Sequence, residues 1–377
     1  MKILQISRVF WPNIGGIEKH VQWLAEALVR RGHQVDVVTL TRSFADNPPY
    51  PAYSCLNVPE SDGKIHVYRV PFVGSTRYPI APRIRRFIPR YDLVHVHGID
   101  FAADWVTATR SWHRRPIVLS THGGFFHTNF AAGLKPLWFQ TATRSMLRFV
   151  DQLLCTSEAD FETFSRVTDR GRLLTQAVDL RPWRRLPRQP EAGAWVNIGR
   201  VDVHKGIADL LRTLALVRDK DSRPFTMEII GPEVVPGLVA ELSAQRDALK
   251  LHQQVHFRGK LPFSELQAAV SRAELGLFPA EYESFGISVV ETMAAGLVPV
   301  LADIRAFRSF VQEGRNGFIT DYKKPEQAAQ SILRARDQAA ALGPAAQKTA
   351  ADYDWDRVVI EVEAVYQSLL GARPAAG

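Results

Sequence analysis

Hydrophobic and polar residues along the first half of the chain follow two alternating periods. Residues 2–7 (KILQIS) form a short apolar segment typical of a strand, and residues 17–31 repeat apolar positions at helical spacing. Gly32 follows the last turn of that helix, and residues 33–40 (HQVDVVTL) are again strand-like. A strand, a helix and a second strand in this order predict a βαβ unit and a parallel sheet covered by helices. Further strands are predicted at KIHVYRV, DLVHVHG, RPIVLSTHG and QLLCTS.

The same alternation restarts in the second half after a break. Residues 181–194 are rich in Pro and Arg and lack periodicity, which is typical of a linker. Beyond them, strands are predicted at AWVNIGR, FTMEIIG, VHFRGK, LGLFPA and VPVLA, with helices between them. We therefore expect an α/β protein of two Rossmann-like domains that face each other across a cleft. The expected domains are residues 1–182 and 183–357, and a last helix at about 358–371 is expected to pack back on the first domain.

Composition narrows the class of protein. The chain has 377 residues, 46% of them hydrophobic and 23% charged, which is globular composition and enough length for two domains. No run of about 18 apolar residues is present, and the first residues read as a strand rather than a secretory signal. Cys55 and Cys155 lie far apart and have no metal-ligand or redox spacing. These features predict a cytoplasmic protein.

Positive charge is concentrated in the first half. Residues 1–190 hold 26 Lys and Arg against 15 Asp and Glu, whereas the remainder holds 21 against 24, for a net charge of +8. An anionic surface or a phosphate-bearing ligand is the natural partner of such a basic half. We expect no nucleic acid, because the chain has no zinc-finger, helix-turn-helix or aromatic RNA-binding motif.

Glycines and cations stand at two predicted strand-to-helix junctions. Gly15 and Gly16 lie where a backbone N–H can approach a phosphate, although an ordinary tight turn would use the same residues. In the second half, Arg200 closes a strand and Lys205 stands just before a helix. Two cations beside a helix N-terminus suit a diphosphate; the alternative is a pair of solvated surface charges.

The segment FPAEYESFGISVVETMAAGLVPV carries two carboxylates eight positions apart. Glu283 lies in a predicted loop and Glu291 on the helix that follows, with Gly286 at the helix start. Both carboxylates can accept hydrogen bonds from sugar or ribose hydroxyls. Glu281 competes with Glu283 for this role, and a helix cap plus a surface charge is the structural alternative.

These segments together carry a family resemblance. The early glycine pair, IGR…HKG, the Glu283/Glu291 segment and the closing WDRVVIEVEAVY resemble the retaining glycosyltransferases of family 4, which have the GT-B fold, over nearly the whole chain. The resemblance implies that Arg200 and Lys205 hold the diphosphate of a nucleotide-sugar donor, while Glu283 contacts the sugar and Glu291 the ribose. It also implies donor contacts at Gly15, Gly16, Gly231, Ser284, Phe285 and Gly286.

The family's active-site histidine is matched by His122, in STHGG at the end of a predicted strand. The resemblance thus implies a catalytic set of His122, Glu283, Arg200 and Lys205. It implies no metal or other cofactor, and the leaving diphosphate is expected to help take the acceptor proton. The roles of His95 and His97 stay open, and a histidine cluster for a metal has no supporting carboxylate spacing.

One loop region gives a narrower resemblance. THGGFFHTNFAAGLKPLWFQTATR is similar to the mannosyltransferases that extend lipid-linked cellobiose in exopolysaccharide assembly. This implies GDP-mannose as the donor, a polyprenyl-diphosphate-linked oligosaccharide as the acceptor and an α-1,3 linkage. Acceptor contacts are expected at Gly123, Phe125 and His127, although for His127 other roles stay open.

A basic segment suggests where the protein works. Residues 80–90 (IAPRIRRFIPR) place apolar residues on one helical face and Arg83, Arg86 and Arg90 on another. Such a segment suits the surface of an anionic bilayer, and the alternative is a packed helix with a solvated rim. We expect peripheral attachment to the inner face of the cell membrane.

Several other functions would fit parts of the same sequence pattern. A sugar-nucleotide epimerase or a UDP-sugar-dependent transferase would use the same fold, and a catalytically silent sugar-nucleotide-binding subunit would bind the donor without consuming it. A NAD-dependent oxidoreductase is disfavoured, because the chain has neither G-x-G-x-x-G nor an acidic residue after the second strand.

Overall fold

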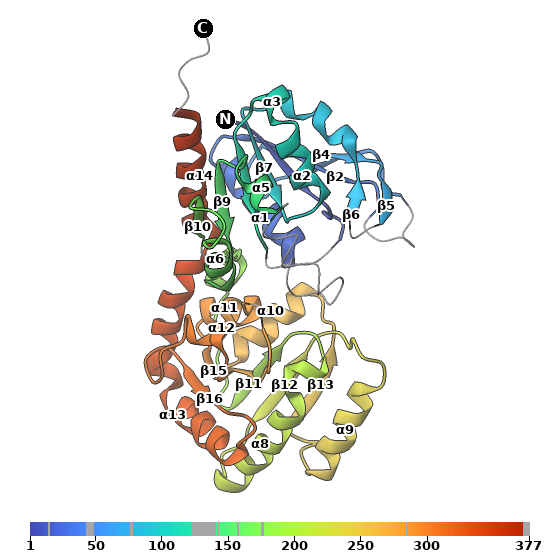
Figure 1. Cartoon of the computed structure of the whole chain (residues 1–377). Helices are drawn as coiled ribbons and strands as arrows, with labels where there is room; N and C mark the ends of the chain where they lie inside the picture. The colour runs from blue at the N-terminus through green and yellow to red at the C-terminus, as the bar shows by residue number, and fades with distance from the viewer. Residues whose placement is uncertain are drawn as a thin grey trace. The chain divides into compact units, whose positions relative to one another are not determined.

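The chain divides into two compact units. The computed structural model describes residues 1–13, 16–42, 49–75, 78–122, 141, 143–156, 158–174, 177–283 and 285–371. Unit 1 consists of Met1–Ala177 and Trp355–Gly377, and unit 2 of Val178–Asp354 (Figure 1). The division thus falls between residues 177 and 178, before the expected boundary at 182/183. Part of the predicted linker is helical. It forms helix α7 (Arg181–Arg184), which belongs to unit 2 and has Trp183 buried.

Unit 1 is built on an eight-stranded sheet of order β10-β9-β8-β7-β1-β2-β4-β3. Neighbouring strands are parallel except at the edge, where β3 runs antiparallel to β4. A separate antiparallel hairpin, β5 and β6, precedes β7. The strands are β1 (Lys2–Ser7), β2 (Gln34–Leu40), β3 (Tyr53–Asn57), β4 (Lys64–Val70), β5 (Val73–Ser75), β6 (Tyr78–Ile80), β7 (Leu93–His97), β8 (Ile117–Ser120), β9 (Gln152–Cys155) and β10 (Gly171–Leu173).

Helices cover both faces of this sheet. On one face, apolar residues of α1 such as Leu24 and Leu28 share a buried cluster with Trp355 and Val362 of α14. The last helix therefore belongs to unit 1, as expected from the sequence, and it begins at Trp355 rather than near 358. The elements are α1 (Gly16–Arg30), α2 (Phe101–Ala108), α3 (Arg110–His113), α5 (Arg144–Leu147), α6 (Glu158–Phe164), α14 (Trp355–Gly371) and the 3-10 turns η1 (Pro82–Arg86) and η2 (Ile88–Arg90).

Unit 2 contains a six-stranded parallel sheet of order β13-β12-β11-β14-β15-β16. Its strands are β11 (Ala194–Ile198), β12 (Thr226–Ile230), β13 (Val255–Gly259), β14 (Leu275–Phe278), β15 (Val298–Ala302) and β16 (Phe318–Thr320). Besides α7, its helical elements are η4 (Val203–Lys205), α8 (Ile207–Lys220), α9 (Leu238–Ala248), α10 (Phe263–Arg272), α11 (Ile287–Ala294), α12 (Arg305–Arg308), α13 (Pro325–Ala350) and η5 (Ala351–Tyr353).

Each sheet has a switch point, where the strand order reverses. In unit 1 the chain moves from β1 to β2 on one side and later to β7 on the other side; in unit 2, β11 has β12 and β14 as its neighbours. Ligands of such sheets bind beyond the carboxyl ends of the strands at this point. The two switch points, β1/β7 and β11/β14, are therefore where functional residues should be sought.

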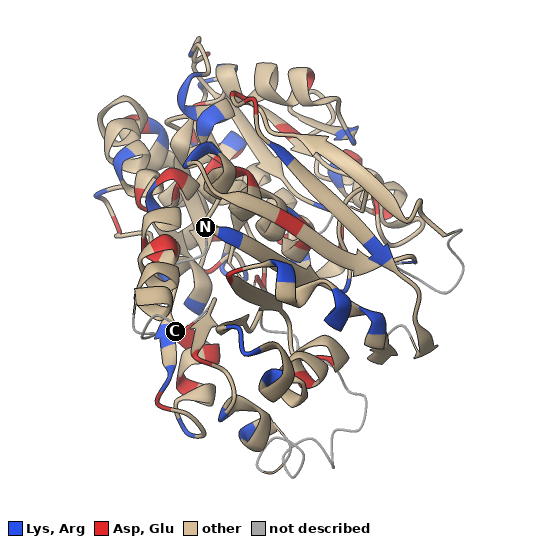
Figure 2. Ribbon diagram, turned by 90° about the horizontal axis from the view of Figure 1, so that it is seen from above, with Lys and Arg blue, Asp and Glu red and all other residues tan. Residues whose placement is uncertain are grey.

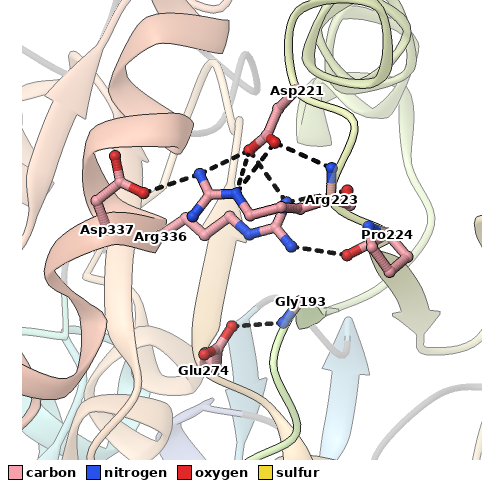
Figure 3. Close-up of polar contacts among 7 residues, drawn as sticks. All are labelled: Gly193, Asp221, Arg223, Pro224, Glu274, Arg336 and Asp337. Atoms are coloured by element: carbon pink, nitrogen blue, oxygen red, sulfur yellow. Dashed lines mark hydrogen bonds and ion pairs between the residues drawn. The ribbon is translucent and has the colours of Figure 1, made fainter.

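A charged network ties the start of β11 to neighbouring elements of unit 2. The guanidinium of Arg336 on α13 donates to the carboxylate of Asp221 (3.2 Å) and to the carbonyl oxygen of Pro224 (2.8 Å), as Figure 3 shows. Nearby, the N–H of Gly193 donates to Glu274 at 2.6 Å. Arg223 is the main reason that the pKa of Asp221 is lowered to about 2. This network fixes the end of the sheet away from the switch point.

The basic segment at 80–90 is not the α-helix that the sequence suggested. It forms the two 3-10 turns η1 and η2, because Pro82 and Pro89 interrupt any longer helix. Ile84 and Ile88 are nevertheless buried in the core of unit 1, and the arginines are exposed. Lys and Arg residues also lie on many other elements (Figure 2). None of the described helices is both long and apolar enough to cross a membrane.

Candidate functional site

A Lys–Glu ion pair lies in a pocket at the β11/β14 switch point of unit 2. Lys205, at the end of η4, donates through Nζ to Glu283 Oε2, and the two side chains are 22% and 25% exposed. The pocket is open to solvent and is lined by both residues together with Gly199, Pro279 and Ser288 among others. An ammonium has three N–H donors, so Lys205 can hold Glu283 and still donate to an anionic ligand.

Two glycines beside the pocket are required by close backbone contacts. Gly206 caps η4 with a φ of +66°, and a Cβ there would lie 2.2 Å from the carbonyl oxygen of Pro279. Gly231 follows β12, and a Cβ there would lie 1.7 Å from the carbonyl oxygen of Gly199. Gly231, which was expected to contact the donor, therefore has a packing reason to be glycine.

The structure separates the two competing loop carboxylates. Glu281 is exposed and forms an ion pair with Lys323 (2.8 Å), which holds the pKa of Glu281 below its usual range. Glu283, not Glu281, is the carboxylate that lines the pocket. The expected partner cation Arg200 directly follows Gly199 but is exposed and stands outside the described pocket lining.

Helix α11 begins at the pocket and carries the second carboxylate. Gly286 caps it with a φ of +107°, and a Cβ there would lie 2.8 Å from the ring of Phe307. Ser288, in the first turn, lines the pocket. Glu291 lies three residues further on, so it shares this face of the helix. The arrangement can therefore present one carboxylate from the loop and another from the helix to one ligand.

Ser284 and Phe285 follow Glu283 in the sequence, just before helix α11. Phe285 packs its ring against Phe310 and Tyr353, with centroid separations of 5.8 and 5.5 Å. This contact supports the loop that carries Glu283. Ser284, expected to contact the donor, lies outside the described residues.

In unit 1, Gly16 is the first residue of α1, which follows β1. A Cβ on Gly16 would meet no atom of a described residue within 4 Å, so packing against these residues does not require a glycine there. The open space is compatible with a ligand at the helix N-terminus. Gly15 lies outside the described residues.

The predicted catalytic histidine stands just beyond the carboxyl end of β8 in an uncommon backbone conformation. His122 has a φ of +50°, in the left-handed region that only a few per cent of non-glycine residues adopt. Its Nε2 lies 3.0 Å from Nδ1 of His97, the last residue of β7. Backbone strain of this kind is concentrated at functional sites, which supports a role for His122.

His122 belongs to a cluster of four histidines at this end of the sheet. His95 and His97 lie on the same face of β7, two residues apart, and their rings are 4.1 Å apart. His95 also contacts the hydroxyls of Tyr366 (2.6 Å) and Ser120 (2.8 Å).

His20 of α1 is the fourth member, with its ring edge-on to that of His122 at 4.6 Å. Both ring nitrogens of His20, and Nε2 of His97, are buried without a hydrogen-bond partner among the described residues. Buried polar atoms of this kind are uncommon and call for an explanation.

Burial keeps these imidazoles neutral. Desolvation lowers the pKa of His95 to about 3 and that of His122 to about 4. The pKa values of His20 and His97 are also lowered by burial and by neighbouring histidines. At neutral pH the cluster can therefore exchange hydrogen bonds but carries no charge.

Among the described residues, three of these histidines form a group that could hold a metal ion. One nitrogen each of His20, His97 and His122 lies within 4.8 Å of the others. Zinc holds imidazole nitrogens at about 2.0–2.1 Å, so the ligands of one ion lie roughly 3.4 Å apart, and three nitrogens this close together could hold such an ion.

A second pocket of unit 1 lies beside the ends of β1 and β2, near the β1/β7 switch point. It is open to solvent and is lined by Arg8 and Asp100 together with apolar residues such as Ile84. Asp100 begins α2 by accepting the N–H of Ala102 at 2.9 Å, and burial raises its pKa to about 6. Sequence reasoning missed this carboxylate, although its place just after a parallel strand could have indicated it.

The expected acceptor residues Gly123, Phe125 and His127 lie outside the described residues. Sequence reasoning left His95 and His97 open and did not single out His20. The spacing of His95 and His97 along one strand was the available signal, because alternate strand residues share a face. The contact between His97 and His122 could not be read from it, since it joins two different strands.

Comparison with known proteins agrees with both units. The description "Glycosyltransferase Family 4" matches residues 14–181, and "Glycosyl transferases group 1" matches residues 186–349. Among solved structures, a glycosyltransferase from Rickettsia africae superposes with a TM-score of 0.76 at 15% identity, covering 99% of each chain. Sucrose-phosphate synthase from Thermosynechococcus elongatus superposes with a TM-score of 0.71 at 19% identity, covering 99% of this chain and all of that one.

Relatives of known activity match over the full length. The GDP-mannose:cellobiosyl-diphosphopolyprenol alpha-mannosyltransferase of Xanthomonas campestris is 34% identical, covering 98% of each chain. The enzyme of the same name from Komagataeibacter xylinus is 32% identical over 98% of this chain and 94% of its own. With two Rossmann-like units, a charged pocket at a switch point and this full-length identity, the chain belongs to the family 4 glycosyltransferases of GT-B fold.

Proposed function

We propose that the protein transfers mannose from GDP-mannose to a polyprenyl-diphosphate-linked oligosaccharide of the cellobiose type, in exopolysaccharide biosynthesis. The observation that carries this proposal is the full-length identity of 34% to an enzyme named for that reaction. The Lys205–Glu283 pocket supports it chemically, because an ammonium suits a diphosphate and a carboxylate suits sugar hydroxyls.

The proposed reaction retains the configuration at the sugar and uses no metal. The bond between the sugar C1 and the diphosphate oxygen breaks, while the acceptor hydroxyl oxygen bonds to C1 from the same face. The hydroxyl proton passes to the departing diphosphate. Lys205 and Arg200 stabilise the negative charge that develops on that diphosphate, Glu283 accepts hydrogen bonds from the sugar, and Glu291 holds the ribose.

The test measures free nucleotide released from GDP-mannose and from a panel of UDP-sugars, with EDTA present, with and without lipid-diphosphate cellobiose. Acceptor-dependent release of GDP is expected. Release from a UDP-sugar alone would overturn the choice of donor, and loss of release in EDTA would overturn the metal-independent reaction. Donor binding without any release would leave a silent binding subunit.

The same assay distinguishes the two loop carboxylates. Glu283→Ala is expected to abolish release, whereas Glu281→Ala, which removes the ion pair with Lys323 outside the pocket, serves as its matched control. Equal activity of the two variants would remove Glu283 from the site.

We further propose that unit 1 binds the surface of an anionic membrane through the turns at 82–90. Arg83, Arg85 and Arg86 are exposed there, and the Arg85 guanidinium lies over the ring of Trp112, which is itself 54% exposed. Clustered arginines beside an exposed aromatic ring suit anionic lipid headgroups and the interface below them. A lipid-linked acceptor would be presented at such a surface.

Cosedimentation with vesicles tests this attachment. Binding to vesicles that contain phosphatidylglycerol, lost with phosphatidylcholine alone and in the Arg85→Ser/Arg86→Ser variant, is expected. A variant at the exposed Arg212 of unit 2 is the control, because it removes positive charge elsewhere. Failure to bind at every salt concentration would overturn the proposal.

A further inference from the structure

The buried hydrogen bond between His97 and His122 leaves one nitrogen of the catalytic histidine for a ligand. His97 Nδ1 and His122 Nε2 are 3.0 Å apart, so one of them carries the hydrogen and the other accepts it. The opposite nitrogen of His122, Nδ1, makes no hydrogen bond with a described residue. We propose that His97 is a positioning residue that occupies Nε2 of His122 and fixes it in the Nδ1–H form, ready to donate to the donor substrate.

The surroundings of His97 favour this tautomer. The other nitrogen of His97, Nε2, is buried without a partner among the described residues. If His122 donated to His97, the proton of His97 would sit on that Nε2 as a buried N–H with no acceptor. Orphaned buried N–H groups are rarer than unused acceptor sites. The opposite arrangement, in which His97 Nδ1–H donates to His122, avoids one.

The chemistry of the donor favours the same tautomer. This step rests on the proposed function, in which the donor carries a diphosphate. Diphosphate oxygens accept hydrogen bonds and cannot donate them. A neutral His122 can donate a hydrogen bond to such a donor only through a nitrogen that bears a proton. The Nδ1–H form supplies this proton on the nitrogen that His97 leaves free, whereas the other form leaves only a lone pair there.

Contacts with neighbouring aromatic rings hold His97 and His122 in place. The ring of His97 lies 4.1 Å from the ring of His95, tilted by 33°, and 5.3 Å from the ring of His122, inclined by 30°. His20, edge-on to His122, is in turn edge-on to Trp355 at 4.9 Å. The ring of His122 is thus contacted from two sides, while its φ of +50° sets the direction of its backbone.

The tautomer can be read directly in the intact protein labelled with [15N]histidine. Two-dimensional long-range 1H–15N spectra distinguish protonated from bare ring nitrogens, and the His122 signals are identified by their loss in His122→Gln. The Nδ1–H form is expected for His122 in the wild type. An Nε2–H form, or averaged shifts from exchange between the two, would overturn the proposal whatever the enzyme's substrate.

His113 gives an internal control in the same spectrum. Its Nε2 faces the carbonyl oxygen of Val106 at 2.9 Å, and its Nδ1 accepts the N–H of Arg115 at 3.0 Å. A carbonyl only accepts and a backbone N–H only donates, so His113 must be in the Nε2–H form. His113 and His122 are therefore expected to show opposite tautomers.

Substitution of His97 tests the consequence for activity. Asn places an amide N–H near the position of Nδ1, whereas Leu fills the space without a hydrogen bond. His97→Leu is expected to give averaged His122 shifts and to lower kcat/KM for the donor about tenfold or more, with little change in acceptor KM. His97→Asn is expected to restore both readouts to within about threefold of wild type.

Further controls distinguish the positioning role of His97 from a loss of stability and from a failure of the proposed function. His113→Asn, at a buried histidine remote from His122, should lower the melting temperature without changing the His122 shifts. If His97→Leu and His97→Asn lose activity equally at full folding, the positioning role is wrong. If the wild type shows the Nδ1–H form but releases no GDP from GDP-mannose, the proposed function fails while the assignment of the tautomer holds.

Discussion

The two units share one strand order around their switch points, yet the groups predicted to act near those points differ in kind. At β11/β14 of unit 2, the pocket holds a charged pair, Lys205 and Glu283, that is partly open to water. Near β7 and β8 of unit 1, the polar groups are buried neutral imidazoles. The fold thus sets where the functional groups stand, and burial sets whether they carry charge.

This difference matches two tasks within one family reaction. Charges that remain hydrated can meet a diphosphate without first losing a large solvation energy. Neutral imidazoles in a dry environment instead make directional hydrogen bonds, whose strength is greater at low dielectric. Three experiments test this difference between the two units.

The largest difference should appear in the response of the two units to acid. The four histidines have folded-state pKa values below about 6.5, the value in an unfolded chain, because burial disfavours their charged forms. On acidification the unfolded chain therefore binds protons first, and the stability of unit 1 falls as the pH drops below about 6.5. Four such groups together cost roughly 4 kcal/mol between pH 6.5 and 5.5.

The stability of unit 2 should change little over the same pH range. The pKa of Asp221 is lowered to about 2, so its contribution is present above the unfolded value near 3.9 and is lost only as the pH falls towards 2. Hydrogen exchange followed by mass spectrometry reports the two units separately within the full chain. Protection in unit 1 should fall at a higher pH than in unit 2, and simultaneous loss in both would contradict the contrast.

The next effect concerns the charged pocket. Lys205→Ala should reduce kcat about 100- to 1000-fold, because it removes a positive charge beside the developing anion of the leaving group. Lys323→Ala also removes a paired lysine, but one that is more exposed and pairs with Glu281 outside the pocket, and it should change kcat little. GDP release at saturating donor measures both variants. Comparable losses would mean that general positive charge, not the pocket, matters.

The sequence predicted the repeated elements well and the contacts between them poorly. The strand β1 was predicted with its observed bounds, and α1 within one residue at each end, because their periodicities are clear. Strand β3 was missed: it is a sheet edge whose exposed and half-buried residues alternate weakly. Local pattern does not indicate that such a segment will pair antiparallel with β4.

The candidate site shows the same limit. Glu283 and Lys205 were chosen from motifs, and the structure joins them as an ion pair although 78 positions separate them in the chain. Arg200 was chosen with equal reason but stands outside the pocket lining, since the direction of a side chain after a strand depends on the turn that follows. The link from His97 to His122 depends on which strands are neighbours, which is a property of topology.

The smallest effect tests whether the remote network of unit 2 is structural alone. Arg336 is 6% exposed and donates to the Asp221 carboxylate and the Pro224 carbonyl, so Arg336→Ala removes hydrogen bonds that include a charge-assisted one and should lower stability by roughly 1–3 kcal/mol. Arg334, two residues earlier on α13, is 55% exposed and pairs with Glu313, so Arg334→Ala should cost less than about 1 kcal/mol. Denaturant unfolding gives both values. Because the network lies at the opposite end of β11 from Lys205, Arg336→Ala should leave kcat unchanged in the folded fraction, and a large fall in kcat would mean that this network positions the pocket.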